Sequence, residues 1–249
     1  MNRRHFLAFG STVFGSVAFA KPLTPLAPVC QAWYLPSTLA TSKNNLTLSV
    51  RDTDSALGRY NAKNCTKTIT LDELVKYHGH LCDGIVFSFL QLFVALQKLF
   101  PDGIIDRTDI QGACKNSPCM VDALSYLTGA RINFQTLRID SSLGASHVIQ
   151  KISTGETYRV QLAEGMFNEE IQKAEGSIRA KVAANETVTP AEIDHVEKLA
   201  ESFIAMMLST PLDKLIKIEQ LEDYKFEPNL SVDVFGKRGD VVNKRVKRD

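Results

Sequence analysis

The longest hydrophobic stretch of the chain runs from Ile85 to Phe100, where only a few polar positions interrupt the apolar ones. An apolar face this broad predicts a helix buried in the core, and Pro101 marks its end. The stretch is shorter than the roughly 20 apolar residues that a membrane-spanning helix needs. A shorter helix is predicted over Leu71–Tyr77, because Thr70 and Glu73 form a capping-box pattern at its start.

The rest of the pattern mixes strands and helices without a regular alternation, which favours a single α+β domain. Alternating or β-rich segments predict strands, whereas helical periodicity with capping signals predicts helices. Ser117, Pro118 and Gly129 have the residue types that begin and end a helix between them. The predicted strands are 109–114, 134–140, 157–162 and 216–221, and the other predicted helices are 164–185 and 190–208.

The first twenty residues have the pattern of an export signal. Arg3 and Arg4 are followed closely by Phe-Leu, a mildly apolar run and a small-x-small cleavage site that ends at Ala20. Paired arginines in this position indicate the twin-arginine route, with an ordinary Sec signal or an uncleaved anchor as alternatives. We therefore expect a periplasmic protein without stable membrane insertion after cleavage.

Two further segments flank the periodic part of the chain. Residues 21–67 are rich in Pro, Ser, Thr and Asn with weak periodicity, which predicts an N-terminal extension. Residues 223–249 form a basic C-terminal tail. The formal net charge of the whole chain is only +1, so no strong field indicates a nucleic-acid partner.

Cysteine chemistry changes the picture. An oxidising destination permits disulfides, and the chain has five cysteines, so at least one thiol stays unpaired or binds a metal. Cys30 and Cys65 lie outside the periodic core and could form a disulfide with each other. A Cys114–Cys119 disulfide is a second possibility, because only five positions separate these residues.

The segment His78-Gly79-His80-Leu81-Cys82 holds two imidazoles and a thiol within five residues. These are the side chains that bind zinc and similar divalent transition metals. The three cannot converge on a regular helix, because positions i and i+2 face apart. If the helix ends near His78 and the chain turns at Gly79, they can converge as a set of three or as part of a set of four.

Cys119 falls near the N-terminus of a predicted helix, where the helix dipole favours the thiolate that binds metal or attacks an electrophile. Asp122 follows one turn later and could orient a metal-binding imidazole, or could simply be exposed. We expect the isolated His195 to lie on the surface. The isolated His147 has no assigned role. The predicted metal ligands are therefore His78, His80, Cys82 and Cys119, with Asp122 supporting them.

These residues resemble a known family. The segment from Tyr77 to Gly84, followed by the Cys119–Gly129 block, is similar to the FmdE-like family, which takes its name from formylmethanofuran dehydrogenase, over roughly residues 68–222. The resemblance implies an α+β domain with a mixed or antiparallel sheet flanked by helices. It also implies a homodimer and a metal site, commonly zinc. The C-terminal zinc finger of some family members is missing, because no cysteine follows Cys119.

Three functions fit these features. The first is an exported zinc-binding protein with an accessory role in metal handling, or in maturation of an exported molybdenum, tungsten or other metallo-oxidoreductase. The second is a metal-dependent enzyme whose zinc keeps an open position for a small molecule. The third is a thiol redox protein that uses Cys82, Cys114 and Cys119. No catalytic residue is assigned, and the sequence does not decide whether the protein is an enzyme.

Overall fold

The computed structural model describes residues 39, 42–52 and 65–229, all within one compact unit. None of the helices in these ranges combines the length and the apolar character needed to cross a membrane. The helices and strands follow one another as β1 (Thr47–Arg51), β2 (Lys67–Thr70), α2 (Leu71–His78), α3 (Asp83–Leu99), β3 (Ile104–Asp106), β4 (Ile110–Cys114), α4 (Pro118–Thr128), β5 (Leu137–Ile139), β6 (His147–Lys151), β7 (Thr157–Leu162), α5 (Glu169–Ala183), α6 (Pro190–Ser209), α7 (Leu212–Leu215) and β8 (Ile216–Gln220).

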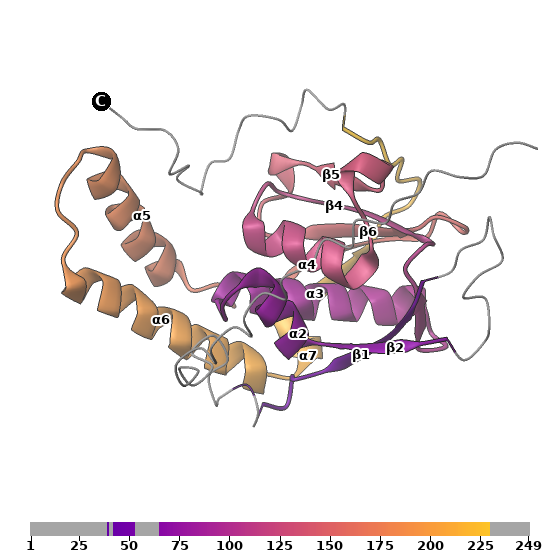
Figure 1. Cartoon of the computed structure of the whole chain (residues 1–249), viewed down its shortest axis with the longest axis horizontal. Coiled ribbons are helices and arrows are strands. Elements are labelled where there is room, and N and C mark those ends of the chain that lie inside the picture. Colours follow the sequence, from indigo (N-terminus) through magenta and orange to yellow (C-terminus); the bar gives the residue numbers. More distant parts are fainter. Residues whose placement is uncertain (1–38, 40–41, 53–64, 230–249) are drawn as a thin grey trace, which may run out of the picture. The chain divides into compact units, whose positions relative to one another are not determined.

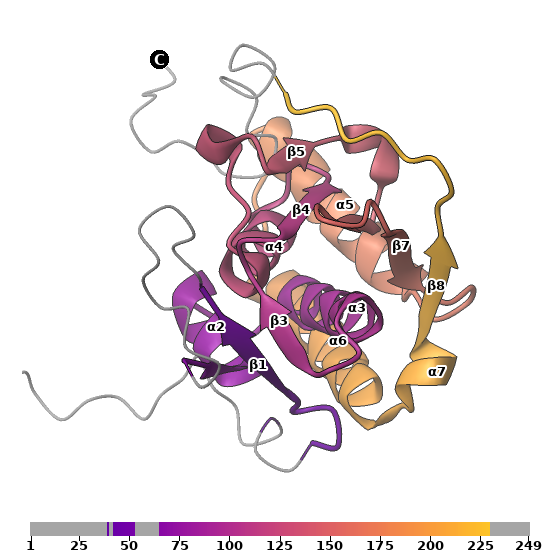
Figure 2. The same cartoon turned by 90° about the vertical axis from the view of Figure 1, so that its right-hand side faces the viewer.

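Helix α3 forms the centre of the core. It contacts helices α2, α4 and α6 and strands β6, β7 and β8, and Figure 2 shows it nearly end-on between them. Because α3 is covered on several sides, most of its residues are buried, including the polar Ser88 and Gln91. The helix begins two residues before the predicted start, because Cys82 acts as its N-cap.

The larger sheet has five strands in the order β5-β4-β6-β7-β8. Strands β4 and β5 are parallel, and the other neighbours are antiparallel, so the sheet is mixed. Helix α4 contacts β4 while α3 contacts β6, β7 and β8, so these two touching helices cover one face of the sheet (Figure 1). The α+β fold class predicted from the sequence is confirmed.

The smaller sheet has the order β2-β1-β3, with β1 antiparallel to β2 and parallel to β3. Strand β1 lies inside residues 21–67, for which the sequence predicted only an extension. Its Leu48 and Val50 are fully buried, so this part of the extension contributes to the core. The strand was missed because it offers only two inward apolar positions.

Most predicted elements are present, but some bounds differ. The predicted strand 134–140 is wrong at its start, because Ile132–Phe134 forms a short 3-10 helix and β5 covers only Leu137–Ile139. Strands β3 and β6 were not predicted. Helix α5 starts at Glu169 rather than at residue 164, because Asn168 caps its first N–H groups. Helix α6 begins after Thr189 with a full capping box, as its sequence indicates.

Residues that follow β8 lie against the five-stranded sheet. The Asn229 side chain pairs with both backbone groups of Ile139 in the edge strand β5, and Gln150 donates a hydrogen bond to the Tyr224 carbonyl. Covering an edge strand in this way reduces its capacity to pair with another chain. The start of the predicted basic tail therefore packs on the domain. Residues 230–249 lie outside the described part of the chain.

Candidate metal centre

The ends of three helices meet at the predicted metal site. Helix α2 ends at His78, and Gly79 takes the left-handed conformation with φ of 107°, which glycine adopts without a steric penalty. The chain then reaches Cys82, whose sulfur accepts a hydrogen bond from the Ile85 N–H at 3.4 Å as the N-cap of α3. Cys119 lies in the first turn of α4. The turn at Gly79 thus provides the convergence that a continuous helix would prevent.

Three donor atoms form a nearly equilateral triangle. The sulfurs of Cys82 and Cys119 are 3.6 Å apart, and each lies 3.7 Å from Nε2 of His78. Zinc bonds of about 2.3 Å to sulfur and about 2.0–2.1 Å to nitrogen give tetrahedral edges of about 3.8 Å between sulfurs and about 3.6 Å between sulfur and nitrogen. The observed separations match these edges, so the three side chains fit one zinc ion.

Asp122 supports the buried imidazole. Its Oδ2 lies 2.8 Å from Nδ1 of His78, whose side chain is only 5% exposed. This bond places the proton on Nδ1 and leaves Nε2 toward the two sulfurs. Carboxylates hold metal-binding histidines in this way in many zinc sites. Of the two roles open to Asp122 in the sequence, the structure therefore places it as the orienting residue.

His80 lies on the solvent side of this cluster. Its ring centroid is 4.9 Å from that of His78, and the residue is exposed. The candidate donor atoms of His78, His80 and Cys82 lie within 4.8 Å of one another, a looser grouping than the triangle. Two sets of three therefore share His78 and Cys82. Cys119 completes the compact set, and His80 completes the exposed one.

The electrostatics of the compact set favour one thiolate. The pKa of Cys119 is lowered to about 5, first by the hydrogen bond from the Cys82 thiol and then by His78. The pKa of His78 is raised to about 9, chiefly by Asp122 and next by Cys119, although burial opposes this shift. The pKa of Cys82 is raised, because its thiol bonds to Cys119 and is buried. A metal must therefore displace protons from this cluster, which makes its binding dependent on pH.

Gly84 allows the sulfurs to approach α3. A Cβ atom at this position would lie 2.7 Å from the sulfur of Cys119 and 3.8 Å from that of Cys82. The first distance is far shorter than a normal nonbonded contact, so any larger residue must displace Cys119. The glycine in the motif is thus required by packing against the opposite helix and not by its own backbone conformation.

Other sequence candidates lie apart from this cluster. Cys114 and Cys119 are both free thiols, and burial raises the pKa of Cys114 to about 12, which makes this thiol unreactive. The predicted Cys30–Cys65 disulfide stays a prediction, because Cys30 lies outside the described residues, while Cys65 is exposed.

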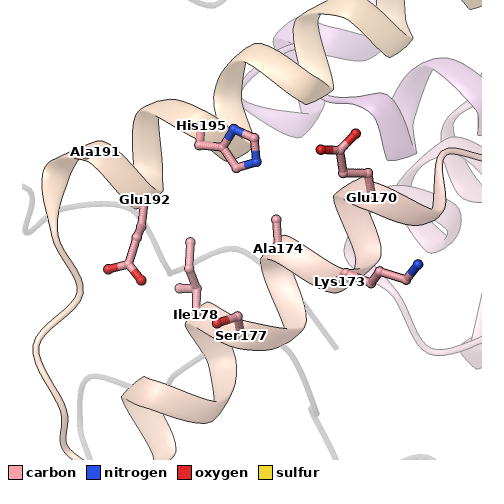
Figure 3. A pocket seen from close by; sticks show the side chains of 8 residues that line it. All are labelled: Glu170, Lys173, Ala174, Ser177, Ile178, Ala191, Glu192 and His195. Carbon is pink, nitrogen blue, oxygen red and sulfur yellow. The ribbon is translucent and has the colours of Figure 1, made fainter.

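The two isolated histidines have different environments. His147 is completely buried, and its Nδ1 lies 2.7 Å from Oε1 of Gln91, while burial lowers its pKa to about 3. No sequence signal indicated this role, because a buried histidine in a strand has no distinctive spacing. His195 is exposed, as expected, and lines a groove of about 520 Å³ between α5 and α6, opposite Glu170 (Figure 3). None of the four predicted metal ligands lines that groove.

The fold and the cluster define an α+β protein with a candidate histidine–cysteine metal centre at converging helix ends. The sequence profile described as "FmdE, Molybdenum formylmethanofuran dehydrogenase operon" matches residues 77–217. The chain belongs to this FmdE family. The matched region begins one residue before His78 and contains all four predicted ligands, so the family assignment and the cluster concern the same part of the chain.

Among solved structures, the chain is similar to an FmdE-like protein of tungsten formylmethanofuran dehydrogenase from Syntrophus aciditrophicus. The two are 18% identical with a TM-score of 0.35, over 61% of this chain and 72% of that chain. No curated protein matches the sequence.

Proposed function

We propose that this protein binds one zinc ion, or a similar divalent transition metal, through His78, Cys82 and Cys119, with His80 as the fourth ligand. The observation that carries the proposal is the triangle of two sulfurs and one imidazole nitrogen with 3.6–3.7 Å edges. The carboxylate of Asp122 on the far side of the His78 ring supports it. Donors of this softness favour zinc over magnesium or calcium.

We further propose an accessory role in metal handling, or in maturation of an exported metallo-oxidoreductase such as a molybdenum or tungsten enzyme. The exposure of His80 supports a handling role, because a partner could displace this ligand while the buried triangle still holds the ion. The signal-like residues 1–20, which lie outside the described part of the chain, support export by the twin-arginine route. By resemblance to its family, the protein would act as a homodimer.

A metal-dependent enzyme is the alternative that the same observation favours. If His80 does not bind, zinc would keep an open position and could polarise a carbonyl or activate water. His80 would then be available to move a proton. The third function, a thiol redox role that includes Cys114, has less support, because that thiol is buried in the core.

The first experiment is elemental analysis of the protein purified without added metal or chelator. The Cys82→Ala/Cys119→Ala variant removes both sulfur donors of the triangle, and Cys65→Ser is the matched control because it changes an exposed thiol. We expect about one metal per chain in the wild type and the control, and none in the double variant. Equal metal content in all three proteins would refute the site.

A second experiment separates carrier from enzyme. The loaded wild type and its His80→Ala variant are mixed with an acceptor chelator of matched affinity, and metal transfer is followed over time. Transfer within minutes, faster still in the variant, supports metal handling. Retention for hours, unaffected by the variant, supports the enzyme alternative. Export is tested separately with Arg3→Lys/Arg4→Lys, which should trap the protein in the cytoplasm if the twin-arginine route is used.

A further inference from the structure

A second cavity lies at the other end of α4 from the candidate metal centre. It has a volume of about 270 Å³ and is lined by the end of the β1 segment, the turn between β3 and β4, the C-terminal end of α4 and the residues that follow it. Arg107, Arg131 and Thr136 are among its lining side chains, and none of the predicted metal ligands is. This size suits a ligand smaller than a typical drug molecule.

The cavity has an excess of positive charge. Asp52 is its only acidic lining residue, and this carboxylate is shared between Arg107 at 3.2 Å and Lys67 at 2.7 Å. Arg131 makes no ion pair with any residue that the structure describes. Its guanidinium instead lies over the Phe134 ring, 5.2 Å from the centroid. One acidic group therefore faces three basic ones in and around the cavity.

Arg107 is held in place and keeps an unused donor. Its side chain is only 11% exposed, and its Nε is buried without a hydrogen-bond partner. Gly129 packs directly beneath it, since a Cβ at that glycine would lie 3.4 Å from Nε and 3.3 Å from the Arg107 carbonyl. Buried donors are nearly always paired in folded proteins, so an orphan one in a cavity-lining arginine indicates a missing acceptor.

The backbone of Arg131 is also fixed. Its N–H donates to the Thr136 hydroxyl at 3.0 Å, and its carbonyl accepts from the N–H groups of Thr136 and Leu137. The second guanidinium is thus presented from an anchored segment, although its side chain is exposed. Two positioned guanidinium groups are the usual protein partners of carboxylate and phosphate oxygens.

We propose that this cavity binds a small oxyanion, either a phosphate or a carboxylate group of a small molecule, between Arg107 and Arg131. The ligand oxygens supply the acceptors that Arg107 lacks and balance the excess positive charge. This site is independent of the metal centre, because it shares no side chain with it.

The test is isothermal titration calorimetry of the full chain with inorganic phosphate, sulfate and acetate, each at constant ionic strength. We expect saturable binding of at least one anion, weakened about tenfold or more in Arg131→Gln, because one charge-assisted interaction is lost. Arg179→Gln is the matched control, since this arginine lies on an exposed face of α5 and should bind as the wild type does. Preference for phosphate and sulfate identifies a tetrahedral ligand, and preference for acetate identifies a carboxylate.

Two results would overturn the proposal. One is the absence of saturable binding of all three anions to the wild type, and the other is equal affinity in Arg131→Gln and the wild type. Arg107→Gln provides a second variant, checked for folding by circular dichroism. Metal content is measured in every variant. It should stay unchanged, so a failure of the anion site can be distinguished from a failure of the metal site.

Discussion

Replacing Gly84 with alanine is the sharpest test of the geometry at the candidate metal centre. The added Cβ would lie 2.7 Å from the Cys119 sulfur and 3.0 Å from its Cβ. Nonbonded heavy atoms are most stable at about 3.5–4.0 Å, so the sulfur must move by about 1 Å. Metal–ligand distances tolerate only about 0.2 Å of error, so a shift of this size removes Cys119 from the ligand set.

The expected energies have opposite signs for folding and for metal binding. Overpacking in a filled region costs about 1–3 kcal/mol. Replacing a helical glycine with alanine returns up to about 1 kcal/mol. We therefore expect the metal-free variant to lose at most about 2 kcal/mol of unfolding free energy. Its metal affinity should fall by more than the roughly 10–100-fold that loss of a merely supporting contact causes.

Gly176→Ala is the matched control. Gly176 lies within α5, and a Cβ there would meet no atom within 4 Å, so the variant gains helix propensity without a clash. It should be more stable by about 0.5–1 kcal/mol and bind metal as the wild type does. Urea unfolding of the metal-free proteins gives the first quantity, and competition with a chromophoric chelator gives the second. Equal metal affinity of Gly84→Ala and the wild type would refute the position assigned to Cys119.

Three further predictions concern single contacts. Asp122→Asn should weaken metal binding about 10–100-fold in the same chelator assay, because the carboxylate no longer orients His78. Neutral, buried His147 should contribute stability above its unfolded pKa of 6.5 and lose it as pH falls toward 3. The unfolding free energy of the metal-free wild type relative to His147→Gln should thus fall by about 2 kcal/mol between about pH 7.5 and about pH 5; a constant difference would contradict the burial of a neutral ring. Asn44→Ala should cost about 1–3 kcal/mol in urea unfolding, because the Asn44 amide donates to two carbonyls at the end of α6 at 2.7–2.8 Å, and an unchanged midpoint would count against that contact.

Local signals in the sequence account for the elements that were predicted well. Helix α4 follows directly from Ser117-Pro118 at its start and from Gly129, whose φ is 74°, at its end. Helix α6 follows from the Thr189–Glu192 capping box. Such signals act over three or four residues, so they do not need the rest of the fold.

Strands β1, β3 and β6 were missed because their burial depends on the rest of the fold. Strand β6 illustrates this, since its polar His147 and Gln150 are buried alongside Val148 and Ile149. A segment with polar residues on both faces has no apolar alternation for the sequence to show. Only α3 on one side and the neighbouring strands on the other make this segment a central strand, where Gln91 satisfies the buried imidazole.

The sequence by itself determined the chemistry of the candidate centre. It identified the imidazoles and thiols that suit zinc, and the glycine turn that lets His78 and Cys82 converge. Tertiary structure decided which donors meet, because α4 brings Cys119 within 3.6 Å of Cys82 while Cys114 is buried in strand β4. It also left His80 on the solvent side and placed the two arginines around one cavity. Residue type fixes what a side chain can bind, whereas only the packing of distant segments fixes which atoms come within bonding distance of one another.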